Sequence, residues 1–309
     1  MPKFSVAIAV FNKEKYVAET LKSVLAQTFT DFEVVILNDG STDNSEAEIL
    51  KFTDPRIRYF SRENQGASAA RNFTIQQANS EYIALMDADD YWYPIYLEEQ
   101  NRLIKEFPEE SVFATATQIK RNGKTFNNNY SLKIFGTDSI LVDYFEASQL
   151  DSVLLSISTV VRKDVFEKVG WYNPKIKSGE DTDLYVRIGL KYKIVFSPKV
   201  CATYILRENS LFYSVKNFEE KADFGEYEIY EKDNTALKKF LDLNRYSLCI
   251  LAKIEGNQTA FQKNFQKINP ENLSKKQQFL LRQNKTVLKY LSKTKDNLEK
   301  LGLRLGTFK

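Results

Sequence analysis

The chain has no histidine among its 309 residues, and this absence removes several kinds of catalysis. Ser-His-Asp hydrolysis, Cys-His thiol chemistry and His-ligated zinc or haem all require an imidazole. Cysteine is nearly as scarce: Cys201 and Cys249 lie far apart among apolar neighbours. They form neither a metal cluster nor a disulfide framework, so we expect buried free thiols in a reducing compartment, by default the cytosol. Any chemistry must therefore use carboxylates.

The sequence also lacks a long apolar run. No segment approaches the roughly 18 apolar residues that a membrane span requires. Met1–Phe4 leads directly into a strand-like segment instead of a signal peptide. Hydrophobic residues nevertheless make up 43% of the chain, which is enough for a substantial core. We therefore expect a soluble protein of one large or two modest domains.

Charge of either sign is plentiful but unevenly placed. The net charge of the whole chain is only +3, yet residues 262–309 contain 12 Lys and Arg against 3 Asp and Glu. The preceding 261 residues therefore carry a net charge of −6. An acidic body is thus followed by a basic C-terminal segment.

Short apolar runs alternate with segments of helical period through the first 90 residues. This alternation predicts an α/β fold with a mainly parallel sheet flanked by helices. A hairpin turn at 121–124, a strand at 156–161 and a helix opening at 179–181 follow, and from about 215 the pattern is helical. We place a domain boundary near residue 210. The early strands are expected at 5–11, 32–37, 56–60 and 82–86, and the helices at 17–27, from about 43, and at about 65–78.

Polar residues gather where these strands end, and ligands of open sheets bind outside the carboxyl ends of strands. Asp87, Asp89 and Asp90 leave a buried strand together. A divalent cation relieves repulsion among such carboxylates, and oxygen ligands favour Mg²⁺ or Mn²⁺, which also bridge the phosphates of a nucleotide. The alternative is that these aspartates only cap the next helix.

Other chemistry fits this cluster less well. A phosphorylated aspartate is expected after the first strand with a small residue following, whereas bulky Tyr91 follows this motif. The sequence has no G-x-x-x-x-G-K-[ST] phosphate loop. It also has no G-x-G-x-x-G after the first strand, so a Rossmann dinucleotide site is unsupported.

Five blocks in fixed order resemble the inverting family 2 glycosyltransferases of GT-A fold. They span about 200 residues, and their joint order is far more specific than any single block. Ala9 stands where that family often has a proline, which is neutral because the contact there is made by backbone. The blocks are Ala9–Asn12, Asn38–Asp43, Asn64–Gly66 with Ala70–Asn72, Asp87–Asp90 and Gly179–Leu184.

The resemblance implies a division of the chain and a set of ligands. Residues 1–210 would be the catalytic domain, binding the nucleotide sugar through the first 110 or so residues and the acceptor through the remainder. Residues 211–309 would form a helical C-terminal region. The donor would be a nucleoside-diphosphate sugar, with a UDP-sugar favoured, and the cofactor Mn²⁺ or Mg²⁺. The acceptor would be a glycan or a lipid-linked glycan.

The resemblance also implies roles for individual residues. Asp39 would contact the nucleobase, Arg71 the nucleotide, Asp87 the ribose or the metal, and Asp89 the metal directly. Asp181 would be the general base, with Glu180 and Trp171 on the acceptor side. The remaining donor-binding positions are Ala9, Phe11, Asn12 and Ala88.

Each of these roles has a simpler alternative. Asp39 could only stabilise its turn. Glu180 and Asp181 could only favour a helix N-terminus through its dipole. Trp171 and Tyr172 could be core residues instead of a stacking platform for an acceptor sugar.

Residues 275–305 have the pattern of a basic amphipathic helix. Such a helix either attaches to an anionic inner membrane leaflet or packs on the protein with a solvated basic face, and the second is the more common outcome. Nucleic acid is disfavoured as a partner, because exposed aromatics do not interleave with the basic residues. The apolar stripe is Phe279, Leu280, Val287, Leu288, Leu291, Leu298, Leu301 and Leu305, and the basic residues include Lys275, Lys276, Arg282, Lys285, Lys289, Lys293, Lys295 and Arg304.

The sequence is therefore interpreted as a cytoplasmic, metal-dependent inverting glycosyltransferase that adds a single sugar. The Q-x-x-R-W signature and membrane spans of processive relatives are not found. The alternative is a catalytically silent nucleotide-sugar-binding or assembly protein of the same fold.

Overall fold

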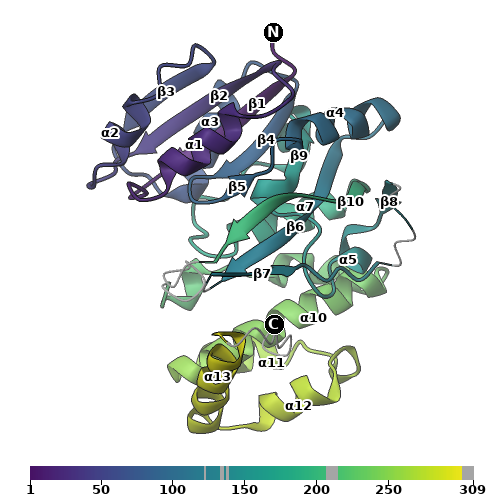
Figure 1. Cartoon of the computed structure of the whole chain (residues 1–309). Coiled ribbons are helices and arrows are strands. Elements are labelled where there is room, and N and C mark those ends of the chain that lie inside the picture. The colour runs from purple at the N-terminus through teal and green to yellow at the C-terminus, as the bar shows by residue number, and fades with distance from the viewer. Residues whose placement is uncertain (122, 133–135, 137–138, 207–214, 301–309) are drawn as a thin grey trace.

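The computed structural model describes residues 1–121, 123–132, 136, 139–206 and 215–300. An α/β body carries a smaller set of helices at one end (Figure 1). A central sheet has the strand order β3-β2-β1-β4-β9-β6-β10-β5, with β7 paired to β6 and β8 to β10. The α/β class and the C-terminal helices expected from the sequence are thus confirmed.

The first half of the sheet is parallel, as the alternating pattern predicts. β1, β2, β3 and β4 pair in parallel, and Ala9 of β1 lies level with Leu37 of β2 and Asp87 of β4. The carboxyl ends of these strands therefore meet at one edge of the sheet. The elements are β1 (Phe4–Val10), α1 (Val17–Leu25), β2 (Phe32–Asp39), α2 (Ser45–Leu50), β3 (Ile57–Arg62), α3 (Ala67–Gln77) and β4 (Tyr82–Asp87).

The second half of the sheet is mixed. β9 runs antiparallel to both β4 and β6, whereas β10 is parallel to β6. Arg121 pairs with Lys124 in the β6–β7 hairpin, which confirms the predicted turn. The elements are β5 (Tyr91–Trp92), α4 (Tyr96–Glu106), β6 (Val112–Arg121), β7 (Lys124–Asn127), β8 (Ile140–Val142), α5 (Tyr144–Ala147), η1 (Ser156–Ser158), β9 (Thr159–Arg162), α6 (Asp164–Val169), α7 (Glu180–Gly189) and β10 (Ile194–Ile205).

Several strands of this half differ from the sequence expectation: the short strands β5 and β8 have no counterpart in it, and β9 and β10 differ for local reasons. The strand expected at 156–161 begins only at Thr159, because Ser156–Ser158 form a 3₁₀ turn. β10 was not expected, because its Ser197-Pro198-Lys199 sequence is typical of a turn. The strand accommodates the proline at a register shift between Ser197 and Val200, the kind of bulge at which proline is tolerated.

Hydrophobic side chains fill both sides of the sheet. Ile8 belongs to the core cluster that contains Leu21 of α1 and Leu97 of α4. Ala7, the next residue along β1, belongs to the opposite cluster with α3 and α7. Because successive strand residues face opposite sides, β1 is buried on both faces, as its continuous apolar run predicts.

The C-terminal helices share part of this core. Phe240 of α10 packs against Tyr144 and Phe145 of α5, with ring centroids 5.2 Å and 5.6 Å apart. The later half of α10 builds a separate cluster with α11, α12 and α13. The predicted boundary near residue 210 lies outside the described residues. The elements are η2 (Phe218–Glu220), η3 (Gly225–Tyr227), α9 (Glu228–Glu231), α10 (Thr235–Glu255), α11 (Gln258–Phe265), η4 (Pro270–Asn272), α12 (Lys275–Arg282) and α13 (Lys285–Lys300).

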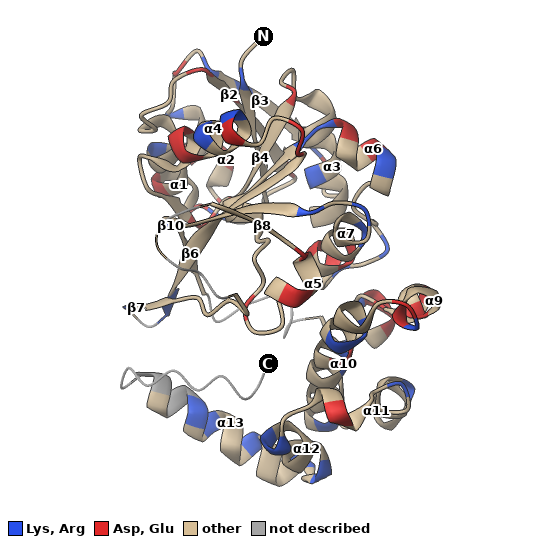
Figure 2. Ribbon diagram, turned by 90° about the vertical axis from the view of Figure 1, so that its right-hand side faces the viewer, with Lys and Arg blue, Asp and Glu red and all other residues tan. Residues whose placement is uncertain are grey.

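The basic helix expected over 275–305 is instead two helices, α12 and α13, separated at Gln283 and Asn284, and both pack on α10 through most of their apolar side chains. Phe279 of the predicted apolar stripe is the exception, since it is 56% exposed. Leu288 is 0% exposed, and Leu280 and Leu281 are also buried in the cluster with α10. The exposed lysines of these helices are Lys275, Lys276, Lys285, Lys289 and Lys293, and Figure 2 shows in blue where basic residues fall along α12 and α13. This arrangement supports the packed-helix alternative. Leu301, Arg304 and Leu305 lie outside the described residues, and over the described part of the chain no helix is both long and apolar enough to cross a bilayer.

α10 also contains two buried, oppositely charged side chains. Asp242 is 0% exposed and Arg245 is 1% exposed, and Arg245 Nη1 donates to Asp242 Oδ1 at 3.3 Å. Neighbouring groups use the remaining capacity of both side chains, so neither charge is left uncompensated. Asp242 accepts further hydrogen bonds from Lys238, Asn269 and Asn272, and Arg245 donates to Glu231.

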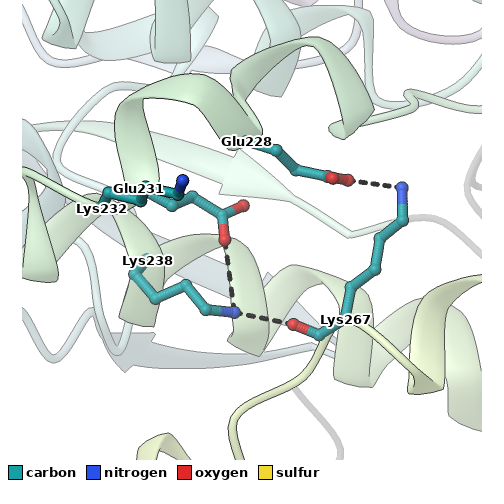
Figure 3. Close-up of a pocket in the computed structure, with 5 residues that line it drawn as sticks. All are labelled: Glu228, Glu231, Lys232, Lys238 and Lys267. Carbon is teal, nitrogen blue, oxygen red and sulfur yellow. Dashed lines mark hydrogen bonds and ion pairs between the residues drawn. The ribbon is translucent and has the colours of Figure 1, made fainter.

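A cavity of about 430 Å³ opens beside this pair and is lined by charged residues (Figure 3). Contacts join Glu228, Glu231, Lys238 and Lys267, whereas Lys232 is exposed. Lys238 Nζ lies 3.3 Å from Glu231 Oε2 and donates to the carbonyl of Lys267, whose own ammonium contacts Glu228. Because these charges are satisfied within the protein, we assign the cavity a structural role.

Replacing Asp242 tests the importance of this buried network. We expect Asp242→Ala to lower the free energy of unfolding by about 3 kcal/mol, because Arg245 and Lys238 lose a buried counter-charge. Urea unfolding followed by circular dichroism measures the change. Glu19→Ala, which removes an exposed partner of Lys22, is the control and should cost less than about 1 kcal/mol. Equal losses in the two variants would contradict the assignment.

Candidate active site

The loops after β1 and β2 are tied together at the carboxyl edge of the sheet. Asn12 has a φ of 52°, a left-handed conformation that asparagine tolerates. Its backbone N–H donates to Ser41 Oγ at 3.0 Å, and its Oδ1 accepts from the backbone N–H of Thr42 at 2.8 Å. Gly40 has a φ of 72° and lies so close to Asn64 that a Cβ would be 2.6 Å from the Asn64 nitrogen. The predicted donor-side blocks therefore form one continuous rim.

Asp39 holds this rim together. The carboxyl is 2% exposed, and its Oδ1 accepts from Arg62 Nε at 2.7 Å. Its Oδ2 accepts from the backbone N–H groups of Gln65 and Gly66 at 3.2 Å and 2.9 Å. These contacts fix the segment after β3 and not the turn that follows Asp39, in which the Ser41 N–H donates to Asn38 Oδ1 at 3.1 Å. Base binding by Asp39 remains a prediction, since each carboxylate oxygen has a second lone pair.

Arg62 is a residue that the sequence analysis missed. Its Nη2 is buried and has no hydrogen-bond partner, beside the Asp39 carboxyl that its Nε binds. In the sequence, an arginine two residues before the Asn64–Gly66 block does not by itself indicate a binding role. Its pairing with Asp39 adds a free donor to the predicted nucleotide site.

The other donor-side positions differ in exposure. Ala9 is level with Asp87, and the Phe11 side chain is exposed at the end of β1. Ala88 is buried, and its methyl group packs in the core cluster beneath α1 and α4. Any contact of Ala88 with a donor would therefore use its backbone.

The three aspartates after β4 have different partners. Asp87 Oδ1 accepts from Arg71 Nη2 at 2.9 Å, and Asp89 Oδ2 lies 2.5 Å from Lys13 Nζ. Asp90 is buried, and its Oδ1 accepts from the backbone N–H of Ile205 at 2.7 Å. Burial, with the charges of Asp87 and Asp89, raises the pKa of Asp90 well above its usual value, so Asp90 is a neutral structural group.

Asp87 and Asp89 suit a cation that takes its other ligands from a bound molecule. Over the described residues no group of three or more acidic or cysteine side chains is placed to hold a metal alone. Mg²⁺ and Mn²⁺ commonly use only one or two carboxylates together with substrate phosphates. The ammonium of Lys13 already lies against Asp89, so this position favours positive charge. The two acids therefore fit the expected cofactor.

Arg71 brings the acids of two distant segments together. Its Nη2 binds Asp87 at the end of β4, while its Nη1 donates to Glu180 Oε1 at 2.8 Å, 109 residues away in sequence. The same Nη1 lies 3.6 Å from Asp181 Oδ1. The predicted nucleotide-binding arginine therefore connects the donor-side acid to the predicted base.

Asp181 lies in the first turn of α7, where Gly179 precedes the helix with a φ of 84°. Its side chain is 33% exposed, but Oδ1 is buried and has no hydrogen-bond partner. Burial raises the pKa of Asp181 to about 7; the positive charge of Arg71 opposes this shift, while Glu180 and Asp87 reinforce it. A carboxyl with this pKa accepts a proton efficiently near neutral pH.

The aromatic residues before α7 belong to the core. Tyr172 is 1% exposed, and the Trp171 indole stacks on buried Phe166 at 5.9 Å with an interplanar angle of 19°. This packing supports the core alternative for both residues, so an acceptor contact of Trp171 remains only a prediction.

Asn72 is a second residue to which the sequence analysis gave no role. Its Nδ2 donates to the carbonyl of Tyr172 at 2.8 Å, and its Oδ1 accepts from the Tyr172 N–H at 3.0 Å. Neighbouring residues of α3 therefore fix the segment before α7 and bind its first acids. Asn72 belongs to the Ala70–Asn72 block that the sequence analysis singled out, but its partner Tyr172 is 100 residues away, so the sequence does not reveal the contact.

Comparison with known proteins agrees with this geometry. Residues 5–170 match the family model described as Glycosyl transferase family 2. An uncharacterized glycosyltransferase of Rickettsia felis is 32% identical over 197 residues, which cover 62% of this chain and 31% of that protein. The chain thus spans about a third of the length of this relative.

Solved structures share the fold. Residues 1–349 of S. aureus TarS, in complex with UDP-GlcNAc, superpose with a TM-score of 0.54 at 20% identity, covering 85% of this chain and 89% of that TarS fragment. A mannosyltransferase of Pyrobaculum calidifontis in complex with GDP-Man and Mn²⁺ gives a TM-score of 0.51 at 14% identity, covering 69% of this chain and 59% of that one. Because the family match spans more than half of the sequence, the chain belongs to glycosyl transferase family 2.

Proposed function

We propose that the protein transfers a single sugar from a nucleoside-diphosphate donor, with a UDP-sugar favoured, to a hydroxyl of a glycan or lipid-linked glycan, with inversion. The observation that carries this proposal is the joining of Asp87 and Asp181 through Arg71. A donor-side acid and a proton acceptor then lie at one site. TarS binds UDP-GlcNAc, which supports a nucleotide-sugar donor.

On the donor side, Asp89 and Asp87 would hold Mg²⁺ or Mn²⁺ together with the diphosphate. When bound, the cation stabilises the negative charge of the leaving group. Lys13 supplies a positive charge beside Asp89, close to where the phosphates would lie. Asp39 and Arg62 close the rim around the nucleobase.

On the acceptor side, Asp181 takes the proton of the attacking hydroxyl. The acceptor oxygen forms a bond to the anomeric carbon as the bond from that carbon to the diphosphate breaks, and its electrons leave with the diphosphate. Attack opposite the leaving group inverts the configuration. Glu180 is 5% exposed and bound to Arg71, so it orients that arginine while the partly exposed Asp181 meets the acceptor.

The chain would act in the cytoplasm, with peripheral contact to the inner membrane leaflet and none with nucleic acid. The apolar side of α13 is occupied by α10, so this contact would be electrostatic and not an insertion. The exposed basic residues that would make it are Lys275, Lys276, Arg282, Lys285, Lys289 and Lys293.

Changing Asp181 tests the base. We expect Asp181→Asn to lower kcat by about 10² to 10⁴-fold while donor binding is unchanged, because only the proton acceptor is lost. In the unchanged protein, kcat/KM should fall below about pH 7 and level off above it, because protonation inactivates a base of that pKa. Release of nucleoside diphosphate measures both.

The matched control is Asp164→Asn, which removes an acid from the first turn of another helix, α6. If both variants lose thermal stability equally and keep full activity, Asp181 serves only the helix dipole.

Changing Asp89 tests the cation site and separates the enzyme from the silent binding protein. Addition of UDP and Mn²⁺ at about a hundredfold excess over Kd should stabilise the protein by about 2.7 kcal/mol. Asp89→Asn should lose the Mn²⁺-dependent part of this stabilisation and also Mn²⁺-stimulated donor hydrolysis. Asp90→Asn, altered where the carboxyl binds Ile205, should keep both. An Asp89 variant indistinguishable from the unchanged protein would favour the binding protein.

Vesicle sedimentation tests the membrane contact. The full chain should sediment with vesicles containing anionic phosphatidylglycerol but not with pure phosphatidylcholine, and added salt should release it, because screening weakens surface electrostatics. Combined Lys285→Glu and Lys289→Glu should abolish sedimentation without changing donor binding. Equal sedimentation with both lipids would argue against an electrostatic contact.

A further inference from the structure

Several buried polar atoms of the described residues, one of them on the proposed base, have no partner that the proposed reaction explains. Four of them have no hydrogen-bond partner: Asp181 Oδ1, Tyr172 Oη, Tyr185 Oη and Ser156 Oγ. Tyr172, Tyr185 and Ser156 are 1%, 2% and 5% exposed. Burying a polar atom without a partner is unfavourable, so such a cluster beside a proposed base needs an explanation.

Tyr172 is the member of this group that shares the Arg71 guanidinium with Asp181. Its ring lies 5.5 Å from the guanidinium carbon of Arg71, whose Nη1 is 3.6 Å from Asp181 Oδ1. Burial raises the pKa of Tyr172, and the negative charge of Asp181 raises it further. In return, the Tyr172 hydroxyl lowers the pKa of Asp181. The phenol ring and the carboxyl thus lie around the same guanidinium, one with an unpartnered donor and the other with an unpartnered acceptor.

The phenol of Tyr172 is also held rigidly. The Asn72 side chain hydrogen-bonds both the carbonyl and the N–H of Tyr172, and the Tyr172 ring is part of the main core cluster. A rigid donor costs little conformational entropy when it forms a hydrogen bond. The hydroxyl therefore has a fixed place from which to orient the carboxyl.

Resting on the proposed function, we propose that Tyr172 is a positioning residue for the base. Neither the Tyr172 hydroxyl nor Asp181 Oδ1 has a hydrogen-bond partner among the described residues; when Asp181 is ionised, the Tyr172 hydroxyl donates a hydrogen bond to Oδ1 and so directs Oδ2 toward the acceptor hydroxyl. The proton stays on the phenol, and no bond to the substrate involves Tyr172. Tyr185, one helical turn after Asp181, lies behind this pair.

Several other groups act on Asp181, and the test must hold them constant. The charged and titratable groups around it are Arg71 from α3, Asp87 from β4, Tyr144 from α5, Glu180 and Tyr185 from α7, Tyr204 from β10, and Tyr172 itself. Replacement of one phenol by phenylalanine leaves all charges in place.

The experiment compares Tyr172→Phe with Tyr185→Phe. For Tyr172→Phe we expect the acidic limb of kcat/KM against pH to move upward by about one unit, because the ionised base loses a hydrogen bond. Near pH 7 kcat should fall about tenfold, with the donor KM unchanged. Tyr185→Phe should leave the limb in place. Thermal unfolding and donor titration confirm that both variants are folded.

Difluorotyrosine at position 172 should shift the acidic limb of kcat/KM in the opposite direction while keeping the ring and its hydroxyl. Fluorine makes the phenol a stronger donor, so the acidic limb should move below that of the unchanged protein. If neither substitution at position 172 moves the limb, the hydroxyl only fills the core and the inference is wrong. Asp181→Asn separates failure of this inference from failure of the proposed function, because full activity of that variant would overturn the proposed function itself.

Discussion

The guanidinium of Arg71 lies among Asp87, Glu180 and Asp181, and the candidate site depends on this contact. Three acids placed so close would repel one another, and the side chain of Glu180 is only 6% exposed. Arginine suits the position because it stays charged and offers several donors in a planar fork. Its pKa is raised well above the usual value, since the charges of Asp181, Asp87 and Glu180 outweigh the opposing effect of burial. One side chain thus binds the end of β4 to the start of α7.

The fold supplies what this arginine needs. Parallel pairing of β1, β2 and β4 brings their carboxyl ends to one edge, so Ala9 and Asp87 are level there. α3 packs behind that edge and presents Arg71 and Asn72 in succession, one to the acids and the other to the backbone of Tyr172. Because Asn72 fixes that backbone, the segment leading into α7 cannot move away from Arg71. The position of the acceptor-side acid is therefore set by a helix of the donor half.

The parts that could be predicted from sequence are those governed by short-range pattern. Apolar runs alternating with helical segments place the first four strands, and the rule for parallel sheets then places Asp39 and Asp87 at one edge. Long-range partners are beyond such reasoning. Nothing near Lys13 indicates Asp89, 76 residues away, and β10 contains a proline that is typical of a turn. The sequence identifies Trp171 and Tyr172 as aromatic residues, but whether their rings are exposed depends on the residues that pack against them. These are Phe166 for Trp171 and Arg71 for Tyr172.

Chemically identical side chains acquire different properties in this site. Asp90 is surrounded by protein and by two other acids, so burial keeps it neutral, and it serves β10. Asp89 lies against the ammonium of Lys13, so it is already paired with positive charge and suits the proposed role of cation ligand. Asp181 has one buried oxygen, although its side chain is 33% exposed. Burial raises the pKa of Asp181 to about 7, and the positive charge of Arg71 limits that rise. A carboxylate paired with positive charge can hold the metal ion that would stabilise a departing diphosphate, whereas a carboxyl that titrates near neutral pH suits removal of a proton. The different roles of these three aspartates therefore follow from their burial and their partners and not from the residue type.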